Sequence, residues 1–124
     1  IESAIEKGAK AFLVQEDINI EGYTFIKVED TRASMANVAD NFYNNPSKEL
    51  GVIGVTGTNG KTSITTFLSE ILSSNNKKVG LVGTIKIFDG DKEVESSSTT
   101  PESIDLQKHF RTMIDNGCDY CEIE

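Results

Sequence analysis

The residues best suited to chemistry in this sequence lie in one glycine-rich run at positions 54–63. The run reads Gly-Val-Thr-Gly-Thr-Asn-Gly-Lys-Thr-Ser and follows an apolar segment. Gly57 and Gly60 allow the backbone to turn tightly, so that consecutive N–H groups can face phosphate oxygens. Lys61 can reach the outer phosphates of a nucleotide as a point charge, and the Thr62 hydroxyl is placed to ligate Mg²⁺. We therefore predict a phosphate-binding loop at these positions.

The spacing of this run departs from the strict phosphate-loop pattern by one residue. The pattern asks for glycine at position 55, where this chain has Val55. The simpler alternative is a glycine-rich turn in which the lysine is incidental. The flanking segments favour the nucleotide site, because residues 51–55 read as a strand buried on both faces. Residues 61–74 read as a helix whose positive dipole end would face the phosphates.

The elements before the loop, within residues 1–50, read as one small α/β unit. A short helix opens it, and strands are expected at residues 11–14 and 24–28. A helix capped by Thr31 is expected from about residue 32 to residue 43. The inner face of that helix is expected to consist of small and aromatic residues: Ala36, Ala39 and Phe42 or Tyr43.

The elements after the loop read as the start of a second α/β unit with a mostly parallel sheet. Thr100 and Pro101 are expected to start a helix that Gly117 ends. Further strands are expected at residues 79–82, 85–88, 93–97 and 118–123, the middle two forming a hairpin. A finished doubly wound sheet needs more strands and more covering helices. We therefore expect these 124 residues, which open without Met, to be a piece of a longer protein.

The charge distribution limits the classes of partner. The net charge is −8, and residues 1–50 and 51–124 each carry −4. Binding nucleic acid through its phosphates needs clustered lysine and arginine, so we expect no nucleic-acid partner. No apolar run approaches the roughly 20 residues needed to cross a bilayer, so we expect no membrane insertion.

The two cysteines, Cys118 and Cys121, form a single C-x-x-C. In a strand, residues three apart point to opposite faces, which suits neither a shared metal nor an easy disulfide. We interpret them as two thiols of a buried strand. Unpaired thiols favour a reducing compartment, so we expect a cytoplasmic protein.

The loop Gly-Thr-Asn-Gly-Lys-Thr resembles that of the Mur ligases and their relatives, the folylpolyglutamate and cyanophycin synthetases. Further stretches are most similar to the MurE type, the UDP-N-acetylmuramoyl-tripeptide synthetases. These stretches are Phe42-Tyr43-x-x-Pro46-Ser47-x-x-Leu50, Val79-Gly80-Leu81-Val82-Gly83-Thr84-Ile85 and Thr99-Thr100-Pro101-Glu102. The resemblance implies an N-terminal fragment, with residues 1–50 ending a uridine-nucleotide-substrate domain and residues 51–124 beginning an ATP-binding central domain.

The resemblance also implies an activity and its reactants. ATP would phosphorylate a carboxylate of UDP-N-acetylmuramoyl-L-alanyl-D-glutamate, and the amine of meso-diaminopimelate or L-lysine would attack the acyl phosphate. The expected cofactors are ATP and Mg²⁺, and the pathway is peptidoglycan synthesis. The fragment alone is expected to be inactive, and the sequence indicates neither the amino acid added nor the oligomeric state.

The resemblance assigns roles to individual residues of this chain. Lys61 is expected to be catalytic, and Thr99 and Thr100 are expected to contact the muramyl-peptide substrate. Glu124 is expected to hold Mg²⁺ with Thr62, although Glu122 shares its strand face and remains a rival. The nucleotide is expected to contact consecutive loop residues: Gly57, Thr58, Asn59, Gly60, Lys61, Thr62 and Ser63.

Two other functions remain open. One is another amide synthetase of the same family, of the cyanophycin or folylpolyglutamate type, which would differ in the molecule that carries the carboxylate. The other is a nucleotide-binding module that switches or docks without adding an amino acid. A ligase should continue beyond this sequence into a Ser-Ser-His segment and a domain for the amino acid.

Overall fold

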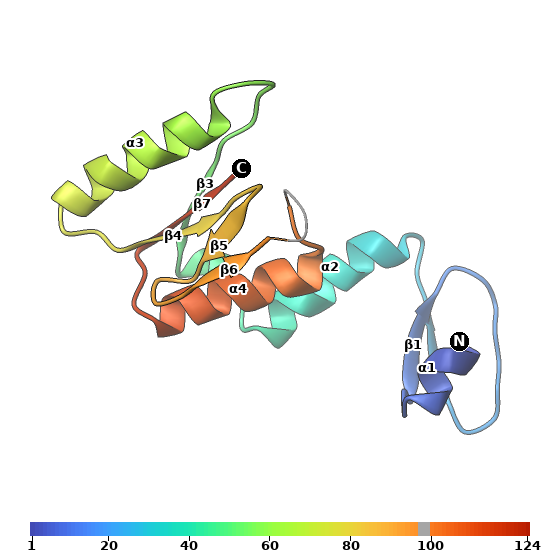
Figure 1. The fold of residues 1–124 in the computed structure, drawn as a ribbon. Coiled ribbons are helices and arrows are strands. Elements are labelled where there is room, and N and C mark those ends of the chain that lie inside the picture. The colour runs from blue at the N-terminus through green and yellow to red at the C-terminus, as the bar shows by residue number, and fades with distance from the viewer. Residues whose placement is uncertain (97–99) are drawn as a thin grey trace. The chain divides into compact units, whose positions relative to one another are not determined.

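The computed structural model of the chain describes residues 1–96 and 100–124. The chain divides into two compact units, Ile1–Val38 and Ala39–Glu124, whose elements Figure 1 traces from blue to red. The predicted division at residue 50 concerns the domains of a longer protein and stays a prediction. No helix among the described residues is long and apolar enough to span a membrane.

The first unit pairs two short strands in parallel. Helix α1 (Glu2–Glu6) precedes strands β1 (Ala11–Val14) and β2 (Thr24–Lys27), and Ala11 lies opposite Thr24 in the register. The Phe12 ring stacks on the Phe25 ring of the neighbouring strand, with 5.2 Å between the ring centroids. Cross-strand aromatic pairs of this kind stabilise a small sheet.

Helix α2 (Thr31–Phe42) differs from its prediction at both ends. The Asp30 carboxylate, not Thr31, caps the helix, because its Oδ1 accepts hydrogen bonds from the N–H groups of Arg32 at 2.8 Å and Ala33 at 3.1 Å. A carboxylate accepts hydrogen bonds from these free N–H groups as well as a hydroxyl does. Thr31 is therefore the first residue of the helix and not its cap. The inner-face prediction is right for Ala39, which is 3% exposed; of the alternatives Phe42 and Tyr43, Phe42 is 78% exposed and Tyr43 is half-buried.

The segment that follows α2 turns sharply and is held by an arginine. Asn44 and Asn45 adopt left-handed conformations, with φ of 62° and 51°, before the 3-10 helix η1 (Pro46–Lys48). Arg111 donates hydrogen bonds from Nε to the Tyr43 carbonyl oxygen at 3.0 Å and from Nη2 to the Asn44 carbonyl oxygen at 3.1 Å. Its Nη2 also pairs with the Glu49 carboxylate at 2.8 Å.

The second unit contains a five-stranded sheet that is parallel on one side and antiparallel on the other. The strands are β3 (Gly51–Gly54), β4 (Val79–Val82), β5 (Lys86–Phe88), β6 (Glu93–Glu95) and β7 (Tyr120–Ile123). Their order is β3-β7-β4-β5-β6, with β7 parallel to β3 and β4 and the remaining pairs antiparallel. The sheet confirms the predicted α/β class. It also places the last strand of the chain between the two strands that flank the loop helix.

Helices α3 (Lys61–Ser74) and α4 (Ser103–Asp115) lie on opposite faces of this sheet (Figure 1). The core on the α4 side contains one cluster of buried residues: Leu50, Val82, Ile87, Phe110, Met113, Cys118 and Cys121. Gly80 permits the close approach of α4, because a Cβ at this position would lie 2.5 Å from Sδ of Met113. Residues of β7 alternate between the faces, so Glu122 and Glu124 point to the α3 side.

Three expectations for this unit are wrong. Strand β3 is not buried on both faces, since in the described part of the chain it pairs with β7 alone and Val52 is 41% exposed. Helix α4 begins at Ser103 after an extended Glu102, not at Thr100 and Pro101. The last strand is shorter than expected, so that Cys118 precedes it and only Cys121 lies within it.

Candidate nucleotide-binding site

The glycine-rich loop connects the carboxyl end of β3 to the first turn of α3. Gly57 and Gly60 have positive φ, of 150° and 81°, in a region that side chains disfavour. Gly60 is the N-cap residue of α3, so the helix opens at the loop. The N–H of Val55 donates to the Ile123 carbonyl oxygen at 2.7 Å. Val55 therefore extends the pairing of β3 with β7, and this extended conformation does not require the glycine of the strict pattern.

Lys61 lies at the start of α3 and reaches back across the loop. Its Nζ donates a hydrogen bond of 2.9 Å to the carbonyl oxygen of Gly57. The bond is exposed to solvent, so breaking it to meet a phosphate costs little compared with a buried bond. The structure thus places the lysine charge against the backbone of the loop.

Glu124 follows β7 and lies beside the loop helix. Its Oε2 accepts hydrogen bonds from the N–H of Thr84 at 3.2 Å and from the Thr84 hydroxyl at 3.0 Å. Its Oε1 accepts from the Thr65 hydroxyl at 3.3 Å. Burial by itself would raise the pKa of Glu124, but the hydrogen bonds from Thr84, Thr62 and Thr65 outweigh it and hold the pKa below its ordinary value. The carboxylate is therefore kept ionised.

Glu122, the rival residue, occupies a different environment on the same face. It is 0% exposed, and its Oε2 accepts a hydrogen bond of 2.8 Å from the Ser69 hydroxyl of α3. No partner among the described residues reaches its Oε1. Burial raises the pKa of this carboxyl, and the Ser69 hydrogen bond only partly opposes the rise. Since it prefers its neutral form, Glu122 suits a metal ion less well than Glu124 does.

The loop and Glu124 line one hollow of about 340 Å³. Its lining consists of Thr58, Asn59, Gly60, Lys61, Thr62, Ser63, Thr84, Ile85 and Glu124. The two expected Mg²⁺ ligands, Thr62 and Glu124, therefore face the same space from different elements. No group of three or more His, Cys, Asp or Glu that could hold a metal occurs among the residues with described positions. A hydroxyl and one carboxylate still fit Mg²⁺, which keeps several waters and takes further oxygens from phosphates.

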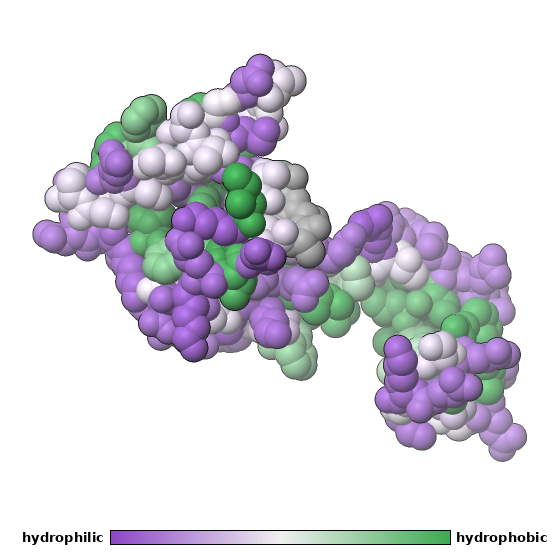
Figure 2. Space-filling model, in the orientation of Figure 1, coloured by the Kyte–Doolittle hydropathy of each residue, from purple (hydrophilic) through white to green (hydrophobic). Residues whose placement is uncertain are grey.

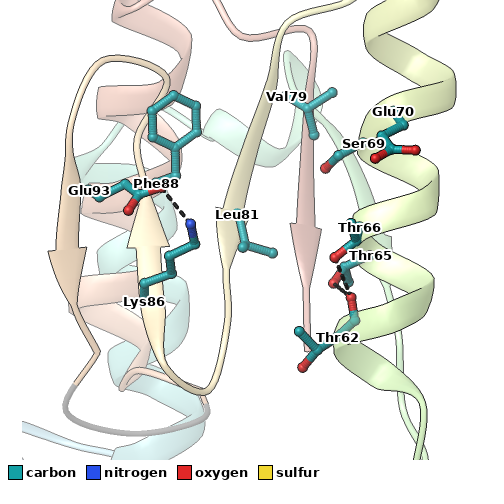
Figure 3. Close-up of a pocket in the computed structure, with 10 residues that line it drawn as sticks. All are labelled: Thr62, Thr65, Thr66, Ser69, Glu70, Val79, Leu81, Lys86, Phe88 and Glu93. Atoms are coloured by element: carbon teal, nitrogen blue, oxygen red, sulfur yellow. Dashed lines mark hydrogen bonds and ion pairs between the residues drawn. The ribbon is translucent and has the colours of Figure 1, made fainter.

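A second hollow runs along α3 toward the hairpin (Figure 3). Thr62, Thr65, Thr66, Ser69 and Glu70 line its helix side, and strands β4 to β6 contribute the rest: Val79, Leu81, Lys86, Phe88 and Glu93. Lys86 and Glu93 form an ion pair between β5 and β6 on its hairpin side. Figure 2 shows hydrophobic atoms in the space under α3. Thr62 lines both hollows, so they lie next to each other beside the first turn of α3.

The structure gathers most of the expected site residues and leaves others apart. Thr99 lies outside the described residues. Thr100 donates a hydrogen bond of 3.4 Å from its hydroxyl to the Glu124 carbonyl oxygen, which places it beside the end of β7. The proposed substrate contacts of both threonines stay predictions.

Thr84 and Thr65 lie at the site but were not among the expected site residues. The sequence pattern could have indicated each of them. Thr84 follows strand β4, which is parallel to β7, and the carboxyl ends of adjacent parallel strands meet at one edge of a sheet. Thr65 lies one helical turn after Thr62 and therefore on the same face of α3.

The cysteines take no part in this site. Cys118 and Cys121 are buried and unpaired, as expected. Burial raises the pKa of Cys121 to about 12 and also raises that of Cys118. Thiols with raised pKa are poor nucleophiles and poor metal ligands at neutral pH, which agrees with a packing role.

A glycine-rich turn from a parallel strand into a helix, a lysine at the start of that helix and a carboxylate at the next parallel strand are typical of phosphate-loop domains. The family model described as Mur ligase middle domain matches residues 55–124. The chain belongs to the Mur ligase family, and the predicted resemblance is confirmed.

Individual relatives agree with this assignment. Over its whole length the chain is 71% identical to the UDP-N-acetylmuramoyl-L-alanyl-D-glutamate--2,6-diaminopimelate ligase of Clostridioides difficile strain 630. It is 50% identical to the protein of the same name from Caldanaerobacter subterraneus subsp. tengcongensis. In each case it spans 26% of the relative.

A solved structure of a ligase with this name shares the fold. It aligns with 99% of this chain at a TM-score of 0.72 and 22% sequence identity, and the match covers 25% of that structure. The chain therefore spans about a quarter of the length of the proteins that it matches.

Proposed function

We propose that this chain is the nucleotide-binding part of an ATP-dependent ligase that adds meso-diaminopimelate to UDP-N-acetylmuramoyl-L-alanyl-D-glutamate. The observation that carries the proposal is the phosphate loop, with Lys61 and Thr62 facing Glu124 across one hollow. The names of the relatives favour diaminopimelate over L-lysine as the amino acid. A soluble precursor of peptidoglycan is made in the cytoplasm, where we place the enzyme.

The reaction needs ATP because a carboxylate is a poor electrophile. A carboxylate oxygen of the D-glutamyl residue attacks the γ-phosphorus, the bond from that phosphorus to the β,γ-bridging oxygen breaks, and ADP leaves. The amine of the amino acid then attacks the acyl carbon, inorganic phosphate leaves, and the amine nitrogen loses its proton as the amide forms. Catalysis of phosphoryl transfer is largely positioning and charge stabilisation.

The residues of this chain supply those two effects. The N–H groups of residues 57–63 would bind the phosphate oxygens, and Lys61 would leave the Gly57 carbonyl to stabilise the charge that develops on the transferred phosphoryl group. Thr62 and Glu124 would hold Mg²⁺, which neutralises phosphate charge when bound. Thr99 and Thr100 would contact the muramyl-peptide substrate.

The proposal is tested by trapping the acyl phosphate in the full-length protein. The protein is incubated with ATP, Mg²⁺ and UDP-N-acetylmuramoyl-L-alanyl-D-glutamate, without an amino acid, and hydroxylamine is added. We expect a hydroxamate of the substrate together with stoichiometric ADP. ATP binding without hydroxamate or ADP would contradict the proposal and favour a non-catalytic nucleotide-binding module.

A further inference from the structure

We propose that Thr84 is a positioning residue that fixes the Glu124 carboxylate, so that Oε1 is the oxygen presented to the metal at the phosphate loop. This inference rests on the proposed nucleotide site. The proposed function assigns Thr84 itself no contact with the nucleotide or the metal. Three observations support it: the hydrogen bonds to Glu124, the register of the strands, and the position of the carboxylate against Gly83.

The hydrogen bonds distinguish the two carboxylate oxygens. Oε2 receives two donors from the same residue, the Thr84 N–H at 3.2 Å and the Thr84 hydroxyl at 3.0 Å. Oε1 receives the Thr65 hydroxyl at 3.3 Å, a longer and therefore weaker bond. Oε1 is turned toward the helix that carries Thr62, whose hydroxyl also hydrogen-bonds this carboxylate, so a cation bound there can meet both expected ligands.

The register of the sheet places Thr84 within hydrogen-bonding distance of Glu124. Strands β4 and β7 are parallel, with Val82 opposite Ile123, and the Glu124 N–H donates to the Val82 carbonyl oxygen at 3.0 Å. The chain then turns at once, because the Gly83 N–H donates to the Lys86 carbonyl oxygen at 2.9 Å. This turn brings both donors of Thr84 to the end of β7.

Gly83 lies directly beside the Glu124 carboxylate. A Cβ at this position would lie 3.6 Å from both Cδ and Oε1 of Glu124, and 3.2 Å from the Lys86 carbonyl oxygen. The carboxylate therefore lies against the Gly83 backbone on one side and is bonded to Thr84 and Thr65 on the others. A carboxylate held in this way loses little freedom when a metal binds, which favours affinity.

The experiment compares nucleotide binding with and without Mg²⁺ in the full-length protein. Calorimetric titrations with the non-hydrolysable analogue AMPPNP are made in excess EDTA and then in Mg²⁺, for wild type, Thr84→Val, Thr84→Ser and Glu124→Gln. Valine keeps the shape and the N–H but removes the hydroxyl, while serine restores the hydroxyl. Thr112→Val is the matched control, because that hydroxyl bonds the Lys108 carbonyl oxygen within α4, on the opposite face of the sheet.

We expect Thr84→Val to weaken binding in Mg²⁺ by about tenfold, the usual effect of losing one hydrogen bond to a charged group. Binding in EDTA should stay as in wild type, Thr84→Ser should recover most of the loss, and Glu124→Gln should lose the Mg²⁺ enhancement. Thr65→Val should show a smaller loss, and it provides a second variant if Thr84→Val does not fold.

Two results would overturn the inference. One is wild-type binding of Thr84→Val in Mg²⁺. The other is an equal loss in EDTA and in Mg²⁺, which would mean that Thr84 only supports the fold of the loop. The proposed function fails separately: if wild type shows Mg²⁺-enhanced binding but traps no acyl phosphate, the role of Thr84 stands and the ligase activity does not. Absence of any Mg²⁺ enhancement in wild type would contradict both.

Discussion

Lys61 Nζ lies 2.9 Å from the carbonyl oxygen of Gly57, so the lysine of the phosphate loop is bonded to the loop's own backbone. A carbonyl oxygen is a weaker partner for an ammonium group than a phosphate is. The lysine is therefore held close to the position where it would be used, by a bond that a nucleotide can replace.

Replacing this lysine should separate catalysis from folding. We expect Lys61→Ala in the full-length protein to reduce ADP formation by at least about 100-fold, because a charge aimed at the transferred phosphoryl group is lost. The fold should persist, since only a solvent-exposed hydrogen bond disappears. Steady-state ADP release and a circular dichroism spectrum are the two measurements. Normal turnover by this variant would contradict the assignment of the loop.

The contact between Gly80 and α4 predicts a steric effect. Gly80→Ala places a methyl group 2.5 Å from Sδ and 2.8 Å from Cγ of Met113, which is fully buried. We expect a loss of about 1–3 kcal/mol in the free energy of unfolding, as for other overpacked cores. Unfolding in urea measures it. Gly54→Ala is the control, because a Cβ there meets no atom within 4 Å.

A double variant checks the cause of that loss. Met113→Ala should itself destabilise the protein by about 2–5 kcal/mol through the cavity that it leaves. If the Gly80 methyl group clashes with Met113, the double variant will lose less stability than the sum of the two single variants. Strict additivity would mean that the effect of Gly80→Ala arises elsewhere.

The hydrogen bonds of Arg111 predict that lysine cannot replace arginine at this position. Its Nε and Nη2 reach three acceptors, the carbonyl oxygens of Tyr43 and Asn44 and the Glu49 carboxylate. A lysine ammonium is a point charge and cannot reproduce this fork. We expect both Arg111→Ala and Arg111→Lys to increase hydrogen exchange in the segment from residue 43 to residue 50. Full protection in Arg111→Lys would show that charge alone holds this turn.

The buried Glu122 predicts a dependence of stability on pH. Its pKa in the folded protein lies above the ordinary value of 4.5, so below pH 4.5 the carboxyl is protonated in both states. Above that pH the unfolded chain ionises first and the folded state retains its proton. The contribution of Glu122 to stability is therefore lost as the pH rises through the raised pKa.

The Glu122→Gln variant removes this titration. The difference in thermal midpoint between variant and wild type should shift in favour of the variant as the pH rises above 4.5. Ser69→Ala gives a useful comparison, because it removes the hydrogen bond to Oε2 but leaves the carboxyl in place. A difference between Glu122→Gln and wild type that stays constant with pH would contradict burial as the cause.

The local elements of this fold could be predicted from the sequence because each has a local cause. Helix α3 begins and ends where expected, since the glycine loop precedes Lys61 and a polar segment follows Ser74. Strand β4 likewise has the expected bounds. The start of α4 could not be predicted in this way, because Thr100 bonds to the end of β7 and is not available as a helix cap.

The arrangement of the site depends on contacts between distant residues, and these were harder to predict. The loop residues and Lys61 are local to one turn, so their grouping follows from sequence spacing. Thr65 and Glu124 meet across 59 residues, which requires β7 to enter the sheet between β3 and β4. Periodicity alone could not rank Glu122 and Glu124, because they share a face. The distinction comes from depth along the strand: Ser69 covers Glu122, and Thr84 is placed at Glu124.

The measurement that tests the central claim most directly is phosphate release by the full-length protein. ATP, Mg²⁺ and UDP-N-acetylmuramoyl-L-alanyl-D-glutamate are supplied, with meso-diaminopimelate and L-lysine tested separately. We predict release that requires the muramyl substrate and meso-diaminopimelate, with L-lysine far less effective and Lys61→Ala inactive. Absence of release with either amino acid, in a protein that binds ATP, would contradict the proposed ligase activity.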